Sequence, residues 1–124
     1  MKRSTILIPL SREHHSALVL AKRIQAHLDD TAVLEELMRQ IPHRHAPGLR
    51  AHFDEEERLL PPSLQAKAPL PLRRFFDEHA RLRHLLAQIE GGDLRAMQEF
   101  ATLLAAHVRF EERELFSCFE QLNA

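Results

Sequence analysis

The sequence predicts an all-α protein, folded as an antiparallel up-down four-helix bundle in a single domain over residues 1–124. The chain has only 3 glycines and is rich in Leu, Ala, Arg and Glu, a composition that favours helices. Its length suits one domain with a hydrophobic core. Proline and glycine clusters divide it into long helical stretches with short connections, which favour antiparallel neighbours.

Each long helix is defined by its end signals. The expected ranges are about 9–28 (or 11–28), 47–60, 70–90 and 93–122. Asp-Asp-Thr at 29–31 ends the first helix, and Pro-Pro-Ser at 61–63 stops the second. Gly91 and Gly92 end the third helix, and Asp93 caps the fourth.

The segment 29–47 has two interpretations. A helical stretch at about 32–40 is followed by Ile-Pro-His-Arg-His-Ala-Pro-Gly, in which Pro42 and Pro47 predict a kink or a loop. The segment is therefore either an extra short helix or the kinked first half of the second long helix.

Charge and composition exclude several classes of function. The chain has 17 Lys and Arg against 18 Asp and Glu, with neither a basic stripe nor an acidic tail, so we expect no nucleic-acid or membrane partner. The apolar run at residues 6–10 is too short for a signal peptide or a membrane span. A single cysteine, Cys118, excludes an internal disulfide and suits a reducing compartment. We expect a cytoplasmic protein, with Cys118 facing the core.

The stretch His-Phe-Asp-Glu-Glu-Glu-Arg-Leu-Leu at 52–60 places an acid where a helix should be apolar. At about 100° per residue, one helical face carries Leu49, His52, Phe53, Glu56, Leu59 and Leu60. Glu57 points elsewhere, as a solvated charge should. A buried carboxylate without a partner is very costly, so we expect something in the core to bind Glu56.

The same pattern, His-x-x-x-Glu-Glu-Arg-x-Leu, recurs at 107–115 and places His107 and Glu111 on the inner face of the fourth helix. A fainter repeat aligns His14 on the first helix with His79 on the third, each followed by apolar residues at matching positions. Two copies packed antiparallel would bring four imidazoles and two carboxylates to the middle of one bundle.

Such a cluster predicts two divalent cations, bridged by Glu56 and Glu111, with two histidines completing the protein ligands of each ion. The i, i+4 spacing lets both side chains of a helix reach one ion. Imidazole and carboxylate ligands without thiolate suit iron, manganese or zinc. With only two carboxylates, reduced iron is accessible. We therefore expect two iron ions with an oxo or hydroxo bridge, and zinc or manganese as alternatives.

Four ordered motifs, REHHSAL, HFDEEERLLPPSL, DEHARL and HVRFEERELF, resemble the hemerythrin-like (HHE cation-binding) domain family over most of the chain. The resemblance implies a hemerythrin-like bundle with a non-haem di-iron centre, which binds dioxygen or acts in iron, nitric oxide or redox sensing and repair. The ligands that it implies are His14, His52, Glu56, His79, His107 and Glu111.

The chain departs from the oxygen-carrying hemerythrins at two positions. Those proteins have a second histidine four residues along the third helix, where this chain has Arg83. His84 follows but projects about 140° from His79. They also have an aspartate five residues after the last histidine. Glu112 has this spacing but is expected to point outward. The missing histidine implies more open coordination at one ion, which favours a reactive or sensing centre over oxygen carriage.

Several local alternatives stay open among the histidines. His15 competes with its neighbour His14 for the inner face. His43 and His45 are expected in a surface loop, and either could instead supply an auxiliary metal contact, because their loop precedes the second long helix. The remaining histidines are expected at the surface: His27 and His84.

Two further alternatives concern the acids. Glu114 also approaches the inner face and competes with Glu111. Without a metal, Glu56 and Glu111 would form salt bridges at the edge of the core, with Arg58 or Arg113.

Three functions are compatible with these features. The first is a di-iron protein that binds or reduces dioxygen, nitric oxide or peroxide, or senses iron or oxygen. The second is a metal storage or sensor module without turnover, and the third is a metal-free helical interaction domain. The sequence assigns no general acid, nucleophile or substrate pocket beyond the metal site, so it does not establish an enzyme, and it identifies no protein partner.

Overall fold

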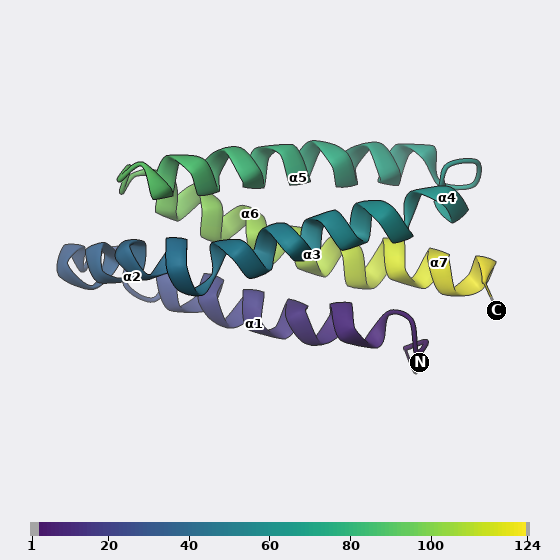
Figure 1. Ribbon diagram of the computed structural model, residues 1–124, viewed down its shortest axis with the longest axis horizontal. Helices are drawn as coiled ribbons and strands as arrows, with labels where there is room; N and C mark the ends of the chain where they lie inside the picture. Colours follow the sequence, from purple (N-terminus) through teal and green to yellow (C-terminus); the bar gives the residue numbers. More distant parts are fainter. Residues whose placement is uncertain (1–2, 124) are drawn as a thin grey trace.

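The computed structural model describes residues 3–123, which form helices and turns and no strand (Figure 1). The elements are α1 (Ile8–Gln25), α2 (Thr31–Arg44), α3 (Ala46–Leu59), α4 (Pro61–Leu64), α5 (Pro69–Glu90), α6 (Ala96–Phe110), the π-helical turn η1 (Glu111–Leu115) and α7 (Phe116–Leu122). The long members are α1, α3, α5 and the continuous segment from α6 to α7, and successive members run in opposite directions (Figure 1). The predicted all-α bundle is confirmed.

The prolines between the first two long helices produce a break of one residue. His45 ends α2 and precedes α3, with φ −123° and ψ −44°. Pro42 lies inside α2, where it removes a helical hydrogen bond, and Pro47 lies in the first turn of α3, where the missing N–H is tolerated. The segment 29–47 therefore contains a separate helix, α2, which packs against α3 and α5.

α1, α3 and α5 each begin within one residue of an expected position, and the first turn of α1 accommodates Pro9. α6 begins at Ala96 rather than at Asp93, because the Asp93 side chain accepts a hydrogen bond from Arg95 N–H in a turn that precedes the helix. The end of α5 at Glu90, before the two glycines, agrees with the prediction.

The fourth long helix contains a π-helical turn, η1, which the sequence did not predict. A π turn holds one extra residue and rotates the following residues by about 100° relative to a regular helix. Phe116 and Phe119 are therefore buried beyond η1. Cys118, expected to face the core, is partly buried and packs against the buried apolar residues at this end of the bundle, in agreement with that expectation.

Two apolar clusters fill the bundle and leave a polar layer between them. The large apolar cluster, toward α2, includes Leu20, Ile24, Phe53, Leu86 and Phe100. The terminal aromatic cluster, toward the ends of the chain, includes Leu10, Leu64, Phe75, Phe110, Phe116 and Phe119. On α1 and α5 the histidine of the polar layer falls between the residues of these two clusters, and on α3 and the α6–η1 segment the two polar residues alternate with cluster residues at the boundary.

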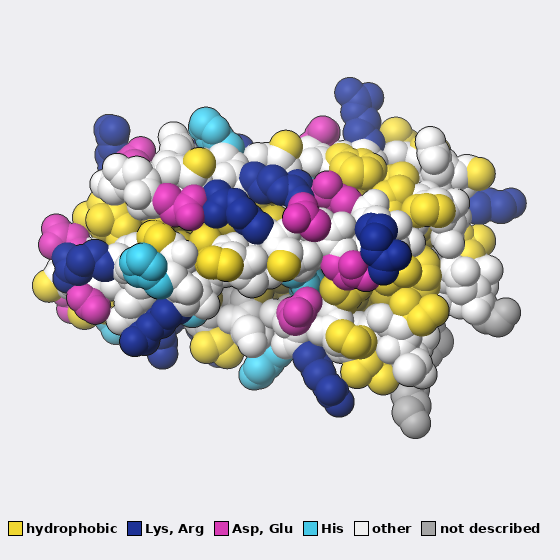
Figure 2. Space-filling model, in the orientation of Figure 1, with side chains coloured by type: hydrophobic (Ala, Val, Ile, Leu, Met, Phe, Trp, Pro, Cys, Tyr) yellow, Lys and Arg dark blue, Asp and Glu magenta, His cyan; other side chains and the backbone are white. Residues whose placement is uncertain are grey.

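The outer surface carries both signs of charge. Acidic and basic side chains are interspersed over the face shown in Figure 2. Exposed ion pairs connect α3 with α5, as between Arg50 and Glu90 at 2.7 Å. None of the helices formed by residues 3–123 combines the length and the apolar character needed to cross a bilayer.

Candidate metal centre

Six polar side chains converge in the polar layer of the bundle. The elements that carry them are α1 (His14), α3 (His52, Glu56), α5 (His79), α6 (His107) and η1 (Glu111). Their exposed fractions are 6% or less, and both acids are at 0%. Each residue continues the apolar stripe of its own helix, which is why folding turns all of them inward. The structure thus brings together the six residues that the sequence singled out.

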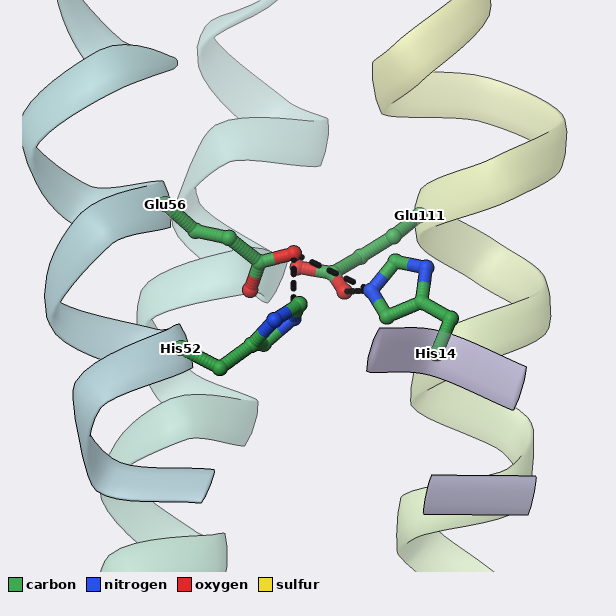
Figure 3. Close-up of side chains that lie close together, drawn as sticks. All are labelled: His14, His52, Glu56 and Glu111. Atoms are coloured by element: carbon green, nitrogen blue, oxygen red, sulfur yellow. Dashed lines mark hydrogen bonds and ion pairs between the residues drawn. The ribbon is translucent and has the colours of Figure 1, made fainter. Parts of the chain in front are cut away.

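The six residues form two groups that share their acids. His14 and His52 make up one group with Glu56 and Glu111, and His79 and His107 make up the other with the same two acids. Within each group, one ligand atom of every residue lies within 4.8 Å of the others. Figure 3 shows the first group, in which the carboxylates from α3 and η1 face each other beside the two imidazoles.

The carboxylate of Glu56 divides its oxygens between the two groups. Oε2 lies 2.9 Å from His52 Nε2, whereas Oε1 lies 3.1 Å from His79 Nε2. Because each oxygen faces a different set of nitrogens, this carboxylate has the arrangement needed to bridge two cations.

Glu111 divides its oxygens in the same way. Oε1 lies 2.8 Å from His14 Nε2, and Oε2 lies 3.1 Å from His107 Nε2. These contacts are close enough for ion pairs but poorly aligned for hydrogen bonds. Within residues 3–123, the buried side-chain atoms that make no hydrogen bond include both Glu111 oxygens and the Nε2 atoms of His52 and His107. Buried polar atoms are normally paired, and a cation at the centre would satisfy these four. The donor set therefore fits a metal ion.

A second set of carboxylates binds the outer nitrogens of the four rings. The distances from Nδ1 to the carboxylate are 2.8 Å for His52 with Glu13, 2.6 Å for His79 with Glu57, 2.8 Å for His107 with Glu78 and 2.6 Å for His14 with Glu112. Each acid comes from a different long member than its histidine, so the pairs form a closed ring that passes from α1 to α3, α5, the α6–η1 segment and back to α1.

This ring of outer carboxylates fixes the tautomer of the imidazoles. An ionised carboxylate only accepts hydrogen bonds, so each Nδ1 donates its hydrogen outward and each neutral ring keeps a lone pair on Nε2 toward the centre. Nε2 with a free lone pair is the form that ligates a metal, and an outer carboxylate increases its basicity.

Glu57 and Glu112 were expected to point away from the site as solvated charges, and that expectation is wrong. Both are half-buried and bind rings on neighbouring members. Rotated by about 100° from the inward direction, their side chains reach the adjacent helix rather than solvent. A sequence signal for the outer acids exists, because each directly precedes or follows one of the six central residues: Glu13, Glu57, Glu78 and Glu112.

Protons take the place of a cation in the metal-free cluster. Burial by itself lowers the pKa of His14, but the attraction of three surrounding carboxylates outweighs it and raises the pKa to about 11. The same competition raises the pKa of His79 to about 9. Burial raises the pKa of Glu111, but its histidine neighbours hold that pKa well below the ordinary value. A metal ion that binds here must displace protons from the imidazoles.

The two sides of the polar layer have different surroundings. The rings of Phe53 and Phe75 lie 4.6 and 4.2 Å from the His79 ring, centroid to centroid. On the other side, a cavity of about 160 Å³ lies between α1, α3 and α6 and borders on His14, His52, His107 and Glu111.

Arg83 stands where oxygen-carrying hemerythrins have a second histidine, and its side chain turns toward the outer carboxylates. It donates hydrogen bonds to Glu57 and to Asp54, and its guanidinium lies 5.5 Å from the Phe53 ring centroid. Because Glu57 in turn accepts from the His79 ring, Arg83 supports this site indirectly.

The remaining alternatives are resolved by burial. His14 is buried in the cluster, whereas its neighbour His15 is exposed. Glu114 is exposed and does not replace Glu111. Arg58 pairs with the exposed Glu55 instead of Glu56. The other histidines outside the cluster are exposed or half-buried, and one of the half-buried ones borders on the cavity: His45.

Comparison with known proteins gives one match that covers nearly the whole chain. The family model of the hemerythrin HHE cation-binding domain matches residues 5–119, a range that includes all six central residues and all four outer acids. No curated protein and no solved structure gives a significant match. The family and the buried His/Glu groups agree on a helical domain suited to binding a metal. The chain belongs to the hemerythrin HHE cation-binding domain family.

Proposed function

We propose that the protein binds two iron ions in the buried cluster and uses them to bind or reduce a small molecule such as dioxygen, nitric oxide or peroxide. One observation carries this proposal. Glu56 and Glu111 each direct one oxygen toward the His14–His52 pair and the other toward the His79–His107 pair. A single cation would not need both histidine pairs, whereas two cations bridged by the carboxylates would use all four inward Nε2 atoms and all four carboxylate oxygens.

The choice of iron follows from the kinds of ligand. Imidazole and carboxylate donors suit iron, manganese and zinc. A set of four neutral imidazoles and two carboxylates stabilises the higher oxidation state less than a four-carboxylate set does. Such a site can hold reduced iron, which would supply electrons to a small ligand.

The residues of the chain would hold and shield the metal pair. Nε2 atoms and carboxylate oxygens bind the ions, and the outer acids hold each ring in its ligating tautomer. Phe75 and Phe53 exclude water from the His79 side. The cavity beside His14 and His52 gives a small molecule room next to the site.

Elemental analysis after anaerobic loading with ferrous iron tests the proposal directly. We expect about two irons per chain, and a near-ultraviolet absorption that develops on exposure to air. Glu56→Ala removes a shared ligand and should leave at most one iron. Glu55→Ala is the matched control, because Glu55 is exposed on the same helix and pairs with Arg58. Retention of both irons by Glu56→Ala contradicts the proposal.

Oxygen consumption and thermal melting separate this function from its alternatives. A di-iron centre that turns over consumes oxygen or peroxide in the presence of a reductant. Iron that raises the melting temperature through mass action without any consumption points to storage or sensing. A melting curve that neither chelator nor iron changes points to a metal-free interaction domain.

A further inference from the structure

The four outer acids differ in what binds them from outside. Three of them also accept a hydrogen bond from an arginine, and these pairs are Arg83 with Glu57, Arg3 with Glu112 and Arg74 with Glu78. Within residues 3–123, Glu13 accepts only from the His52 ring. The His52 side of the cluster therefore has the one outer acid that no arginine holds in place.

Glu13 is also the most exposed of the four. Its side chain is 57% exposed, against 17% to 28% for the others. A single contact at such an exposed carboxylate is weak and is readily exchanged for water. Glu13 can therefore turn away from the His52 ring while the fold stays intact, whereas each of the other three acids would have to break a second contact with an arginine.

Glu13 faces a surface groove between α1 and α3. The groove has a volume of about 240 Å³ and is bordered by Glu13, Ala51, His52, Glu55 and Arg58 together with apolar side chains. Glu55 and Arg58 form an ion pair with each other. Among the described side chains of the groove, this leaves Glu13 as the acid that forms no ion pair with an arginine or lysine, so a cation is attracted to this position.

The His52 ring connects the groove with the centre of the cluster. Its Nδ1 lies 2.8 Å from Glu13 Oε1, and its Nε2 lies 2.9 Å from Glu56 Oε2. The ring is buried, and Nε2 makes no hydrogen bond. Figure 3 shows this ring beside the carboxylates of Glu56 and Glu111. One buried ring therefore separates an exposed acid in the groove from the two central acids.

We propose that Glu13 and His52 form the entry route for the metal. Glu13 captures a divalent cation from solvent in the groove, and the His52 ring, no longer held by Glu13, turns and admits the cation to Glu56. The other three rings are held by acids that arginines bind, so they keep the shape of the cluster during loading. The proposal rests on the proposed function only in that the cluster binds metal ions, and it depends neither on the identity of the metal nor on any reaction.

Cobalt(II) uptake by the metal-free protein, followed by stopped-flow absorption, tests this route. Glu13→Gln keeps an oxygen that accepts the Nδ1 hydrogen of His52 but removes the charge that captures the cation. We expect its association rate constant to fall by at least about tenfold. Because entry and exit follow the same path, the dissociation rate constant should fall as well, and the affinity should change much less than either rate. An unchanged association rate overturns the proposal.

Two further substitutions separate capture from other effects of charge. Glu55→Gln, the matched control, removes an equal charge from the same groove at a residue that binds Arg58 rather than a ring, and should change the association rate by less than about twofold in physiological salt. Glu57→Gln weakens the support of the His79 ring, so it should act mainly through faster dissociation. Equal slowing of association in Glu13→Gln and Glu55→Gln, or a Glu13→Gln effect confined to faster dissociation, overturns the proposal.

Ala51 tests the groove without any change of charge. It is exposed and borders on the groove beside His52. Ala51→Leu narrows the groove and should slow cobalt uptake, whereas Ala51→Ser, which has nearly the same size, should not, with folding of each variant verified by circular dichroism. Equal uptake rates in these two variants contradict entry through the groove. A wild-type protein that takes up neither cobalt nor iron contradicts the proposed function as well, whereas the other outcomes leave metal binding established.

Discussion

The two copies of the His-x-x-x-Glu-Glu-Arg-x-Leu repeat begin alike and continue differently. In both copies the histidine and the first glutamate are buried, and the second glutamate binds a ring on another long member. The first copy lies on a regular helix that ends at Leu59. The second passes through the π-helical turn η1 into α7. The histidine and the glutamates that could support a metal are therefore arranged alike in both copies, whereas the helix that follows them differs between the copies.

This difference shows what the extra residue in η1 contributes. It leaves Glu111 in place and turns Phe116 toward the cluster, where its ring stacks on His14 with centroids 5.1 Å apart. A regular helix would direct Leu115 and Cys118 along that face instead. The π turn thus provides an aromatic cover for one side of the site, in keeping with the frequency of such turns at functional sites.

The most disruptive way to break this comparison is to insert an alanine after Glu114, an exposed residue within η1. The π turn already holds one extra residue, so a second one rotates Phe116 and Phe119 by about 100° from their buried positions. We expect a loss of at least about 3 kcal/mol in the free energy of unfolding of the metal-free protein, measured with urea. Deletion of Glu114 is the control: it removes the extra residue, leaves Phe116 four residues after Glu111 on the same face of a regular helix, and should change this free energy by less than about 1 kcal/mol. Equal stability of the insertion and deletion variants would show that the positions of Phe116 and Phe119 do not depend on η1.

The first histidines of the two units, His14 and His79, allow a comparison by pH. Their pKa values are raised to about 11 and about 9, so NMR titration of the metal-free protein should show His79 losing its proton first. Because both values exceed the ordinary 6.5, their contribution to stability is complete below pH 6.5 and declines as pH rises through 9 and 11.

The two central glutamates set the lower limit of the pH range in which the metal-free protein is most stable. Glu56 and Glu111 have pKa values below 4.5, so their contribution is present above pH 4.5 and is lost as pH falls further. The metal-free protein should therefore be most stable between about pH 4.5 and 6.5. Metal affinity should rise with pH, by about tenfold per unit for each proton displaced. A metal-free protein whose melting temperature rises from pH 6.5 to 9 contradicts this assignment.

The outer acids of the two copies, Glu57 and Glu112, test whether the repeat is functionally symmetric. Each lies 2.6 Å from an Nδ1 atom, so Glu57→Ala and Glu112→Ala should each lower metal affinity by about 10- to 100-fold. Competition with a chromophoric chelator measures the loss, and Glu55→Ala on α3 serves as the control. A change of less than about twofold in either variant would show that its acid does not support the metal.

The sequence was sufficient to predict the bundle and the central cluster, but not the contacts between helices. The bundle and the six central residues followed from local periodicity and the repeat, because both depend on spacing along single helices. The positions of the outer acids could not be predicted from local periodicity or from the repeat. Glu57 and Glu112 are solvated charges on an isolated helix, and only the neighbouring helix turns each of them into a partner of a ring.

The π turn and the cavity could not be predicted from the sequence either. Residues 111–115 read as an ordinary helix, and their extra residue shows only in the burial of Phe116 and Phe119. The cavity depends on how α3 packs against α1 and α6, whose side chains line it. Both features depend on packing between segments distant in the sequence.

The smallest expected effects concern the residues that hold the outer acids. Arg83 donates to Glu57, and Ser11 Oγ donates to Glu112 Oε2 at 2.8 Å. These contacts are partly exposed, so Arg83→Ala and Ser11→Ala should each weaken metal binding by only about two- to threefold. Chelator competition at low and high salt distinguishes the two. The Arg83 effect should shrink with salt because it depends on charge, whereas the Ser11 effect should not. An Arg83→Ala variant that loses metal as completely as Glu57→Ala would show that the arginine, rather than the ring of acids, fixes the His79 side of the site.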